Sequence, residues 1–81
     1  MNIAEAFSIQ LKKYRKLQNL TQESLALKSN LDRTYISLLE RQKKKPTLNV
    51  VFKICNSLNV STSDFIKEME EYMKSPIFEM K

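Results

Sequence analysis

Three polar side chains in the stretch SNLDRTYIS have the types and spacing for recognition by hydrogen bonding. Arg33 is always charged and presents a planar fork of donors, while the hydroxyls of Thr34 and Ser37 both donate and accept. On a helix, Ile36 and Leu39 face one side, toward a core. Thr34 and Ser37 lie on the opposite side, with Arg33 at its N-terminal edge. The pattern indicates a surface that binds a polar partner.

The composition argues against catalysis and metal binding. The chain has no histidine, the commonest general base and metal ligand, and its single cysteine, Cys55, cannot form an internal disulfide. No group of carboxylates or cysteines has the spacing of a metal site, and no nucleophile has a base partner. We expect no enzyme activity, no metal and no cofactor, and we interpret Cys55 as core filler.

The charge is unevenly distributed along the 81 residues, whose net charge is +5. Residues 1–62 carry eleven basic and four acidic side chains, whereas residues 63–81 carry three basic and five acidic ones. A basic body favours a polyanionic partner, and the acidic end favours a different role. Because no apolar run is long enough to span a membrane and the first residues lack the layout of a signal peptide, we expect a cytoplasmic protein without membrane contact.

The hydrophobic period is helical along the whole chain, which predicts a single all-α domain. Phe7, Leu11 and Tyr14 fall on one face of the first helix. No stretch alternates with period two for long enough to form a strand. Helices are expected over roughly residues 3–18, 22–28, 33–41, 48–58 and 62–74.

Residues that favour helix starts support these boundaries. Thr21, Asp32 and Thr47 stand at N-cap positions, where a side-chain oxygen accepts a hydrogen bond from a free backbone N–H. Ser61, with Asp64 three residues later, forms a capping-box pattern for the last helix.

Asparagine replaces glycine at the helix ends of this chain, which contains no glycine. Asn19, Asn30 and Asn59 stand where one helix should end and the next begin, and asparagine tolerates the left-handed conformation well. The loop QKKKP has no such residue, and there Pro46 is expected to stop the helix.

A short turn around Asn30 separates the second and third expected helices. Such a turn fits two helices that cross steeply, as in the helix-turn-helix motif. In that motif the N-terminal part of the second helix enters the major groove of DNA. In this reading Arg33 could bond a guanine bidentately, and Thr34 and Ser37 can bond base edges or touch a thymine methyl.

The segment LTQESLALKSNLDRTYISLLERQKKKPTLNVVFKICNSLNV resembles the phage-repressor-like family (Cro/CI, or XRE) of DNA-binding domains. Within that family, LDRTYIS followed by ER is most similar to the small controller proteins of restriction–modification systems. These are homodimeric regulators that control their own gene and that of the nuclease. The matched positions are Thr21-Gln22, Leu25-Ala26, Ile36-Ser37, Glu40-Arg41 and Pro46.

The resemblance implies roles for further residues. Arg33, Thr34 and Ser37 match positions that read bases. Arg15 and Glu40 match a structural ion pair that ties the first helix to the third. The residues expected to contact the DNA backbone are Gln22, Tyr35, Arg41, Lys43, Lys44 and Lys45.

The last expected helix carries an apolar stripe that is broad for so small a domain. Phe65 and Met69 are expected to complete the core, and the rest of the stripe would be exposed on a monomer. We expect a homodimer that places two reading helices about 34 Å apart on a palindromic operator. The expected interface residues are Ile66, Met69, Tyr72 and Met73.

The leading hypothesis is a homodimeric regulator that binds an operator in double-stranded DNA, with RNA polymerase as a further candidate partner. Residues 1–74 would form the DNA-binding and dimerisation domain, and residues 75–81 a tail. One alternative is the DNA-binding part of an antitoxin or a phage-type repressor, whose tail binds a protein. Another is a protein-interaction module that uses this fold without DNA.

Overall fold

The computed structural model describes residues 1–74, and this part of the chain contains five α-helices and no strand. The predicted all-α fold is confirmed, with helix ends that differ from the expected ones by a single residue. None of these helices is long and apolar enough to cross a membrane. The helices are α1 (Ile3–Leu17), α2 (Gln22–Ser29), α3 (Arg33–Glu40), α4 (Leu48–Ser57) and α5 (Thr62–Met73).

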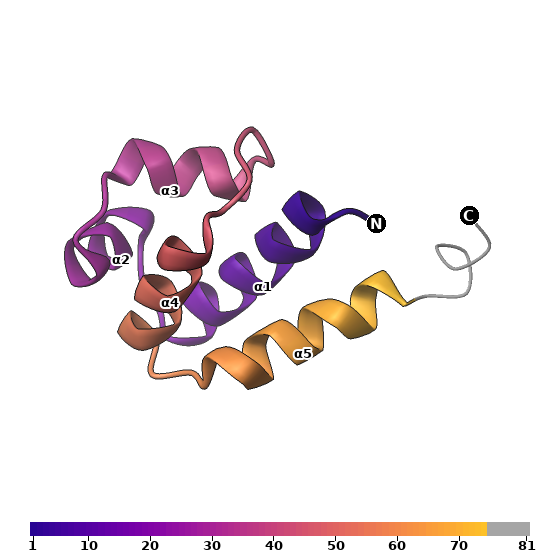
Figure 1. Ribbon diagram of the computed structural model, residues 1–81. Helices are drawn as coiled ribbons and strands as arrows, with labels where there is room; N and C mark the ends of the chain where they lie inside the picture. The colour runs from indigo at the N-terminus through magenta and orange to yellow at the C-terminus, as the bar shows by residue number, and fades with distance from the viewer. Residues whose placement is uncertain (75–81) are drawn as a thin grey trace.

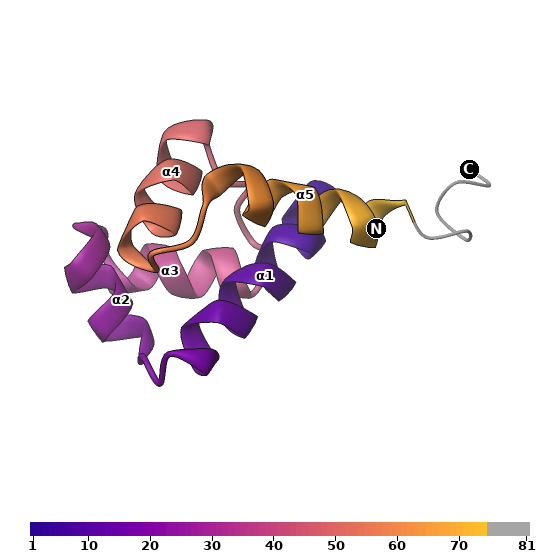
Figure 2. The ribbon, with the colours of Figure 1, turned by 90° about the horizontal axis from the view of Figure 1, so that it is seen from below.

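The helices form a bundle in which α3 and α5 occupy opposite edges, with α1 and α4 between them (Figure 1). Both views show α5 running beside α1 (Figure 2), and α1 also packs against α3. The N-terminus and the end of α5 lie at the same end of the molecule. This arrangement leaves α3 at the surface while its inner face rests on α1.

The core contains the apolar faces that the helical period predicts. Phe7 and Leu11 of α1, Ile36 of α3 and Phe65 of α5 are fully buried. The rings of Phe7 and Phe65 meet edge to face with centroids 5.7 Å apart. Tyr14 is only partly buried at the edge of this core. Burial of each phenylalanine stabilises the fold by roughly 1.5–3 kcal/mol.

The helix starts follow the predicted caps with two corrections. Thr21, Thr47 and Ser61 each accept a hydrogen bond from the backbone N–H three residues later. Asp32 has the extended backbone of an N-cap, but its carboxylate makes no capping bond, so the expectation that it caps α3 is wrong in that respect. Only the Ser61 half of the expected capping box is present, with its hydroxyl 3.3 Å from the Asp64 nitrogen.

The helix ends contain four left-handed residues rather than the three expected. Asn19, Asn30 and Asn59 have φ angles of 56°, 55° and 55°. Gln42 has φ 62°, so the expectation that the QKKKP loop lacks such a residue is wrong. A left-handed conformation costs a non-glycine residue roughly 1–2 kcal/mol, and asparagine offsets part of that cost by local hydrogen bonding. At Gln42 the next nitrogen, of Lys43, bonds the Leu38 carbonyl at 2.8 Å, which closes the end of α3.

Candidate nucleic-acid interface

The N-terminal part of α3 presents the predicted base-reading residues to solvent. Arg33 and Thr34 are exposed and Ser37 is half-buried. Ile36 and Leu39, on the other face of the helix, are buried and fix it to the core. Because a helix repeats about every 3.6 residues, this anchoring turns the polar side chains outward. Arg33 makes no side-chain hydrogen bond within the described residues, so its donors are available to a ligand.

Ser37 is oriented by a neighbour one turn later. The Nε of Arg41 donates to the Ser37 hydroxyl oxygen at 3.2 Å. The serine O–H proton then remains available to an acceptor outside the protein, and the Arg41 guanidinium lies on the same exposed face. The structure thus brings a predicted backbone-contact residue beside a predicted base-reading residue.

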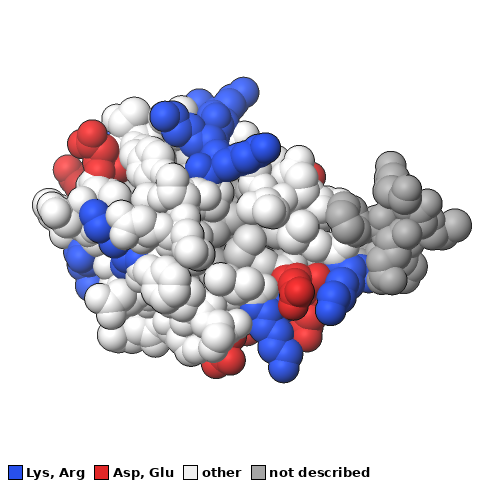
Figure 3. Space-filling model, in the orientation of Figure 1, with Lys and Arg blue, Asp and Glu red and all other residues white. Residues whose placement is uncertain are grey.

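The loop after α3 carries the strongest positive charge on this side of the molecule. Lys43, Lys44 and Lys45 are exposed, and basic side chains gather over this loop in Figure 3. The ammonium of Lys44 lies 6.0 Å from the centroid of the Tyr35 ring, a cation–π distance. Tyr35 itself packs partly against the core, so its ring links the loop to α3. In the same figure α5 carries both acidic and basic side chains.

A nearly buried ion pair joins α1 to the end of α3, at the residues that the resemblance implies. Arg15 donates to Glu40 through Nε at 2.6 Å and through Nη2 at 3.0 Å, and through Nη1 to the Leu20 carbonyl at 2.8 Å. Gln22 also donates to the Glu40 carboxylate, at 3.1 Å. The Glu40 backbone carbonyl accepts a bond from the Ser8 hydroxyl at 2.6 Å, which holds the helix end from a second side.

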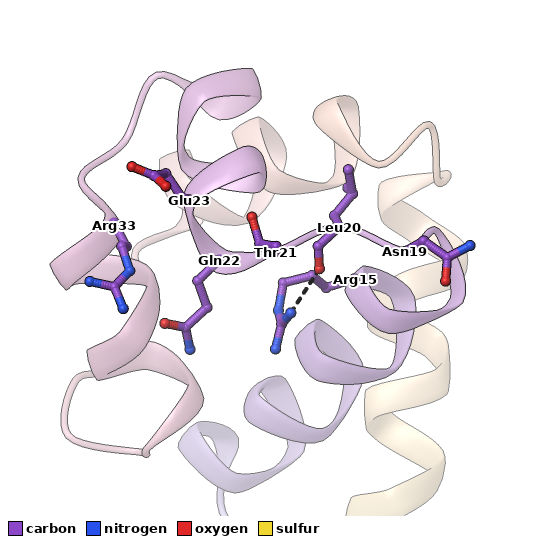
Figure 4. A pocket seen from close by; sticks show the side chains of 7 residues that line it. All are labelled: Arg15, Asn19, Leu20, Thr21, Gln22, Glu23 and Arg33. Carbon is purple, nitrogen blue, oxygen red and sulfur yellow. Dashed lines mark hydrogen bonds between the residues drawn. The ribbon is translucent and has the colours of Figure 1, made fainter.

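Arg15, Leu20 and Gln22 line a polar hollow between the end of α1, the start of α2 and the start of α3 (Figure 4). Arg15, Gln22 and Arg33 all face it, so the hollow brings a predicted backbone contact and a predicted base reader together. It lies at the N-terminus of α2, where the helix dipole and free N–H groups favour an anion. No spacing pattern predicts the bond between Gln22 and Glu40, which are eighteen residues apart.

A second surface, on the far side of the basic loop, is an apolar groove. We define it by the residues Ile3, Pro46, Leu48, Ile66, Met69 and Met73. Leu48 is 66% exposed and Ile3 51%, and because both line the same groove they form part of one contiguous apolar patch. Sequence reasoning found only the α5 part of this groove. The other members belong to different segments of the chain, and their common face appears only once the helices are assembled.

The structure divides the four expected interface residues into two sets. Ile66, Met69 and Met73 line the apolar groove, although Met69 is itself largely buried. Tyr72 lies on the flank of α5 that faces α1, where its hydroxyl is 3.2 Å from the Gln10 amide oxygen.

Another polar cluster ties α5 to α1. The Glu68 carboxylate accepts bonds from Gln10 at 2.8 Å and from the Tyr14 hydroxyl at 2.7 Å. These bonds hold the pKa of Glu68 below its usual value, and the bond to Glu68 raises the pKa of Tyr14 to about 12. The cluster is structural, because it lies between two packed helices and away from the polar hollow.

The arrangement suits recognition of a polyanion. The exposed groups on the α3 side are guanidinium, ammonium, hydroxyl and amide donors, which match phosphate and base edges. Among the described residues no group of three acidic or cysteine side chains is placed to hold a metal ion.

Comparison with known proteins agrees with this geometry. A helix-turn-helix family model matches residues 11–65. Control protein C.SmaI of Serratia marcescens is 39% identical over 61 residues, covering 75% of this chain and 73% of that protein. Control protein C.MunI of a Mycoplasma species is 38% identical over 66 residues, covering 80% of this chain and 89% of that protein.

Solved structures agree as well. The restriction–modification controller protein C.Esp1396I superimposes with a TM-score of 0.83 and 36% identity, over 93% of this chain and 96% of that chain. The same protein has been crystallised as a tetramer in complex with its natural 35 base-pair operator. These relatives are regulators and controller proteins rather than enzymes. The resemblance stated from sequence is confirmed: the chain belongs to the helix-turn-helix family and is a DNA-binding regulator of the restriction–modification controller type.

Proposed function

We propose that this protein is a cytoplasmic homodimeric regulator that binds a palindromic operator and controls its own gene and that of a restriction endonuclease. The observation that carries the proposal is the exposed edge of α3. It presents Arg33, Thr34 and Ser37 on a helix held to the core by Ile36 and Leu39. A rigid helix with outward donors is what base reading in the major groove requires.

The site residues divide into two roles. Arg33, Thr34 and Ser37 read base edges, and they supply specificity. Affinity comes mainly from contacts with phosphates, which release condensed counterions and therefore weaken as salt rises. The residues with this second role are Gln22, Tyr35, Arg41, Lys43, Lys44 and Lys45.

The apolar groove supports the homodimer. A second copy related by a two-fold axis would cover the groove with the same groove, which removes its apolar residues from water in both copies. The α3 helices would then stand about one DNA turn, ~34 Å, apart. In this proposal residues 1–74 form the DNA-binding and dimerisation unit. Ile66, Met69 and Met73 belong to the interface directly, and Tyr72 supports it by holding α5 on α1.

The test of the dimer compares two substitutions of exposed leucine-sized residues. Ile66→Glu places a charge in the groove, and the matched control Leu27→Glu places the same charge on α2, where Leu27 is 80% exposed. Sedimentation should show a monomer for Ile66→Glu and a dimer for both Leu27→Glu and the wild type. Footprints should show that Ile66→Glu also loses palindromic protection. A dimer that withstands Ile66→Glu would contradict an interface at this groove.

One relative favours a second candidate, a phage-type repressor. The immunity repressor protein of Bacillus phage phi105 is 34% identical over 58 residues, but these cover only 40% of that protein. A regulator of this class would bind operators at phage genes rather than beside an endonuclease gene. Mapping the sites bound by this protein in the cell distinguishes the two candidates, and mapping RNA polymerase at the same sites shows whether it is recruited or excluded there.

A further inference from the structure

We propose that Glu40 is a positioning residue for the DNA-backbone contact of Gln22. In this role its carboxylate holds the Gln22 amide in one orientation, so that an N–H of the amide remains ready to donate to a phosphate. The inference rests on the proposed function, because it assumes that the α2 side of the polar hollow faces a DNA strand. It assigns Glu40 a second task beyond its ion pair with Arg15.

The carboxylate chemistry determines which end of the amide faces inward. Glu40 has a side chain only 5% exposed, and its two oxygens accept three bonds, two from Arg15 and one from Gln22. An ionised carboxylate only accepts hydrogen bonds, so the Gln22 atom at 3.1 Å must be Nε2. A flipped amide would bring its oxygen against the carboxylate, and this repulsion disfavours the flip.

The other side of the amide is consistent with this orientation. In Figure 4 the Gln22 oxygen points to the side on which Arg33 lies, and the amide nitrogen points away from it. A guanidinium carries only donors, so it favours the oxygen on its side. Each end of the Gln22 amide therefore faces chemistry that suits it.

Gln22 also keeps a donor for an anion at the hollow, beside the guanidinium of Arg33, which is free within the described residues. The Arg15 guanidinium is held by Glu40 and the Leu20 carbonyl through three of its five N–H donors. The Nε2 of Gln22 carries two hydrogens and donates one of them to Glu40, which leaves one. At the same helix start, the Ser24 nitrogen is occupied by the Thr21 hydroxyl at 3.0 Å. The phosphate contact of Gln22 therefore depends on how Glu40 holds its amide.

Substitution of Glu40 should affect DNA binding differently if the residue only stabilises the fold than if it positions Gln22. If Glu40 only stabilises the fold, its substitution changes the melting temperature and leaves the contribution of Gln22 to DNA binding intact. If it positions Gln22, that contribution depends on it. A double-mutant cycle separates the two cases, because it measures coupling rather than either single effect.

The cycle uses the full chain and a mixed-sequence duplex of about 30 base pairs, below the melting temperature of every variant. Gln22→Met keeps the length of the side chain and removes its donors. It should lower affinity about tenfold in the wild type, as expected for a hydrogen bond to a charged group, and less than about twofold in the Glu40→Gln background. Lys44→Ala is the control, and its loss should be the same in both backgrounds, because Lys44 has no bond to Glu40.

Equal losses from Gln22→Met in the two backgrounds would overturn the positioning role. No loss in either background would remove Gln22 from the phosphate contact and overturn the inference while leaving the proposed function standing. If the wild type binds neither this duplex nor the DNA upstream of its gene, the proposed function fails as well.

A second measurement does not depend on the Glu40 variant being folded. The side-chain amide of Gln22 gives two cross-peaks in a nitrogen–proton NMR spectrum, one for each proton. When the duplex is added to the wild type, the proton that is not bonded to Glu40 should shift and the bonded proton should stay. A larger shift of the bonded proton would mean that DNA breaks the bond to Glu40, which would overturn the proposal.

Discussion

Two ion pairs of α1 with other described helices differ in environment, and we therefore expect very different costs for removing them. Arg15 and Glu40 have side chains 13% and 5% exposed, with Nε and Oε2 2.6 Å apart. Lys13 and Glu68 are 44% and 38% exposed and 3.7 Å apart. Both Arg15→Ala and Lys13→Ala remove one positive charge from the same helix. Lys13→Ala is therefore a matched control for Arg15→Ala.

The loss of stability expected for each substitution depends on how deeply its ion pair is buried. Removing one partner of a buried pair leaves an uncompensated charge and costs about 3 kcal/mol or more. Arg15→Ala also leaves the Leu20 carbonyl, now bonded at 2.8 Å, without its donor. An exposed pair contributes about 1 kcal/mol or less. For a domain of this size 1 kcal/mol shifts the melting temperature by roughly 4–8 °C, so Arg15→Ala should lower it by roughly 12–24 °C and Lys13→Ala by at most about 8 °C.

The assay is thermal unfolding of wild type and variants at one protein concentration, because dimerisation makes the melting temperature concentration-dependent. Arg15→Met keeps much of the side-chain stem and removes the charge. The melting temperature of Arg15→Met should be close to that of Arg15→Ala if the loss of the ion pair dominates. It should be close to that of the wild type if packing of the side-chain stem dominates. Equal melting temperatures for Arg15→Ala and Lys13→Ala would refute the argument from burial.

Three further predictions test other parts of the structure. Lys44→Ala should weaken binding equally on operator and mixed-sequence DNA. It should also reduce the slope of the logarithm of the binding constant against the logarithm of the salt concentration by about 1, as measured by titration at several salt concentrations. Asn30→Ala should lower the free energy of unfolding by about 1 kcal/mol in denaturant titration, whereas Asn30→Gly should be neutral or stabilising, because Asn30 has φ 55°. Ultraviolet titration should find Tyr14 ionising near pH 12, and Glu68→Gln should lower that pKa toward its usual 10.0, because the bond to Glu68 raises it.

The Glu68 cluster also determines how the stability of the fold changes in acid. The bonds from Gln10 and Tyr14 hold the folded-state pKa of Glu68 below the usual 4.5. Its contribution to stability is therefore present above that usual value and is lost as the pH falls through the lower folded-state pKa. Glu68→Gln should flatten the fall in stability below about pH 4.5. A wild type and a variant with parallel acid curves would contradict this, as would an unchanged Tyr14 titration.

The fold was predictable because its signals are local. The apolar spacing of Phe7, Ile36 and Phe65 identifies inward faces, and Asn30 marks a left-handed turn without any tertiary information. Two predictions from local residue preferences were wrong at the ends of α3. Asp32 stands at the right position but makes no capping bond, and Gln42 takes a conformation that its residue type does not favour. The Lys43–Leu38 backbone bond explains the second case, and it depends on how the chain closes the helix.

The site was predictable only in part, because much of it depends on contacts between distant residues. The edge of α3 follows from the period around Ile36, and the resemblance implied the pair of Arg15 and Glu40. The bond from Gln22 to Glu40 crosses from one helix start to another helix end, and no spacing rule reports it. The apolar groove likewise joins Ile3 of α1 to Leu48 of α4, and no spacing pattern in the sequence relates these two residues.

The most direct test of the central claim is a footprint on the DNA upstream of the gene for this protein, with wild type and Arg33→Ala compared on that site and on a mixed-sequence duplex. The wild type should protect two half-sites about one helical turn apart. Arg33→Ala should lose about 1–3 kcal/mol on the operator and relax preference at one base pair, with a much smaller loss on the mixed-sequence duplex. Equal losses on both duplexes, or no palindromic protection by the wild type, would contradict base reading by α3.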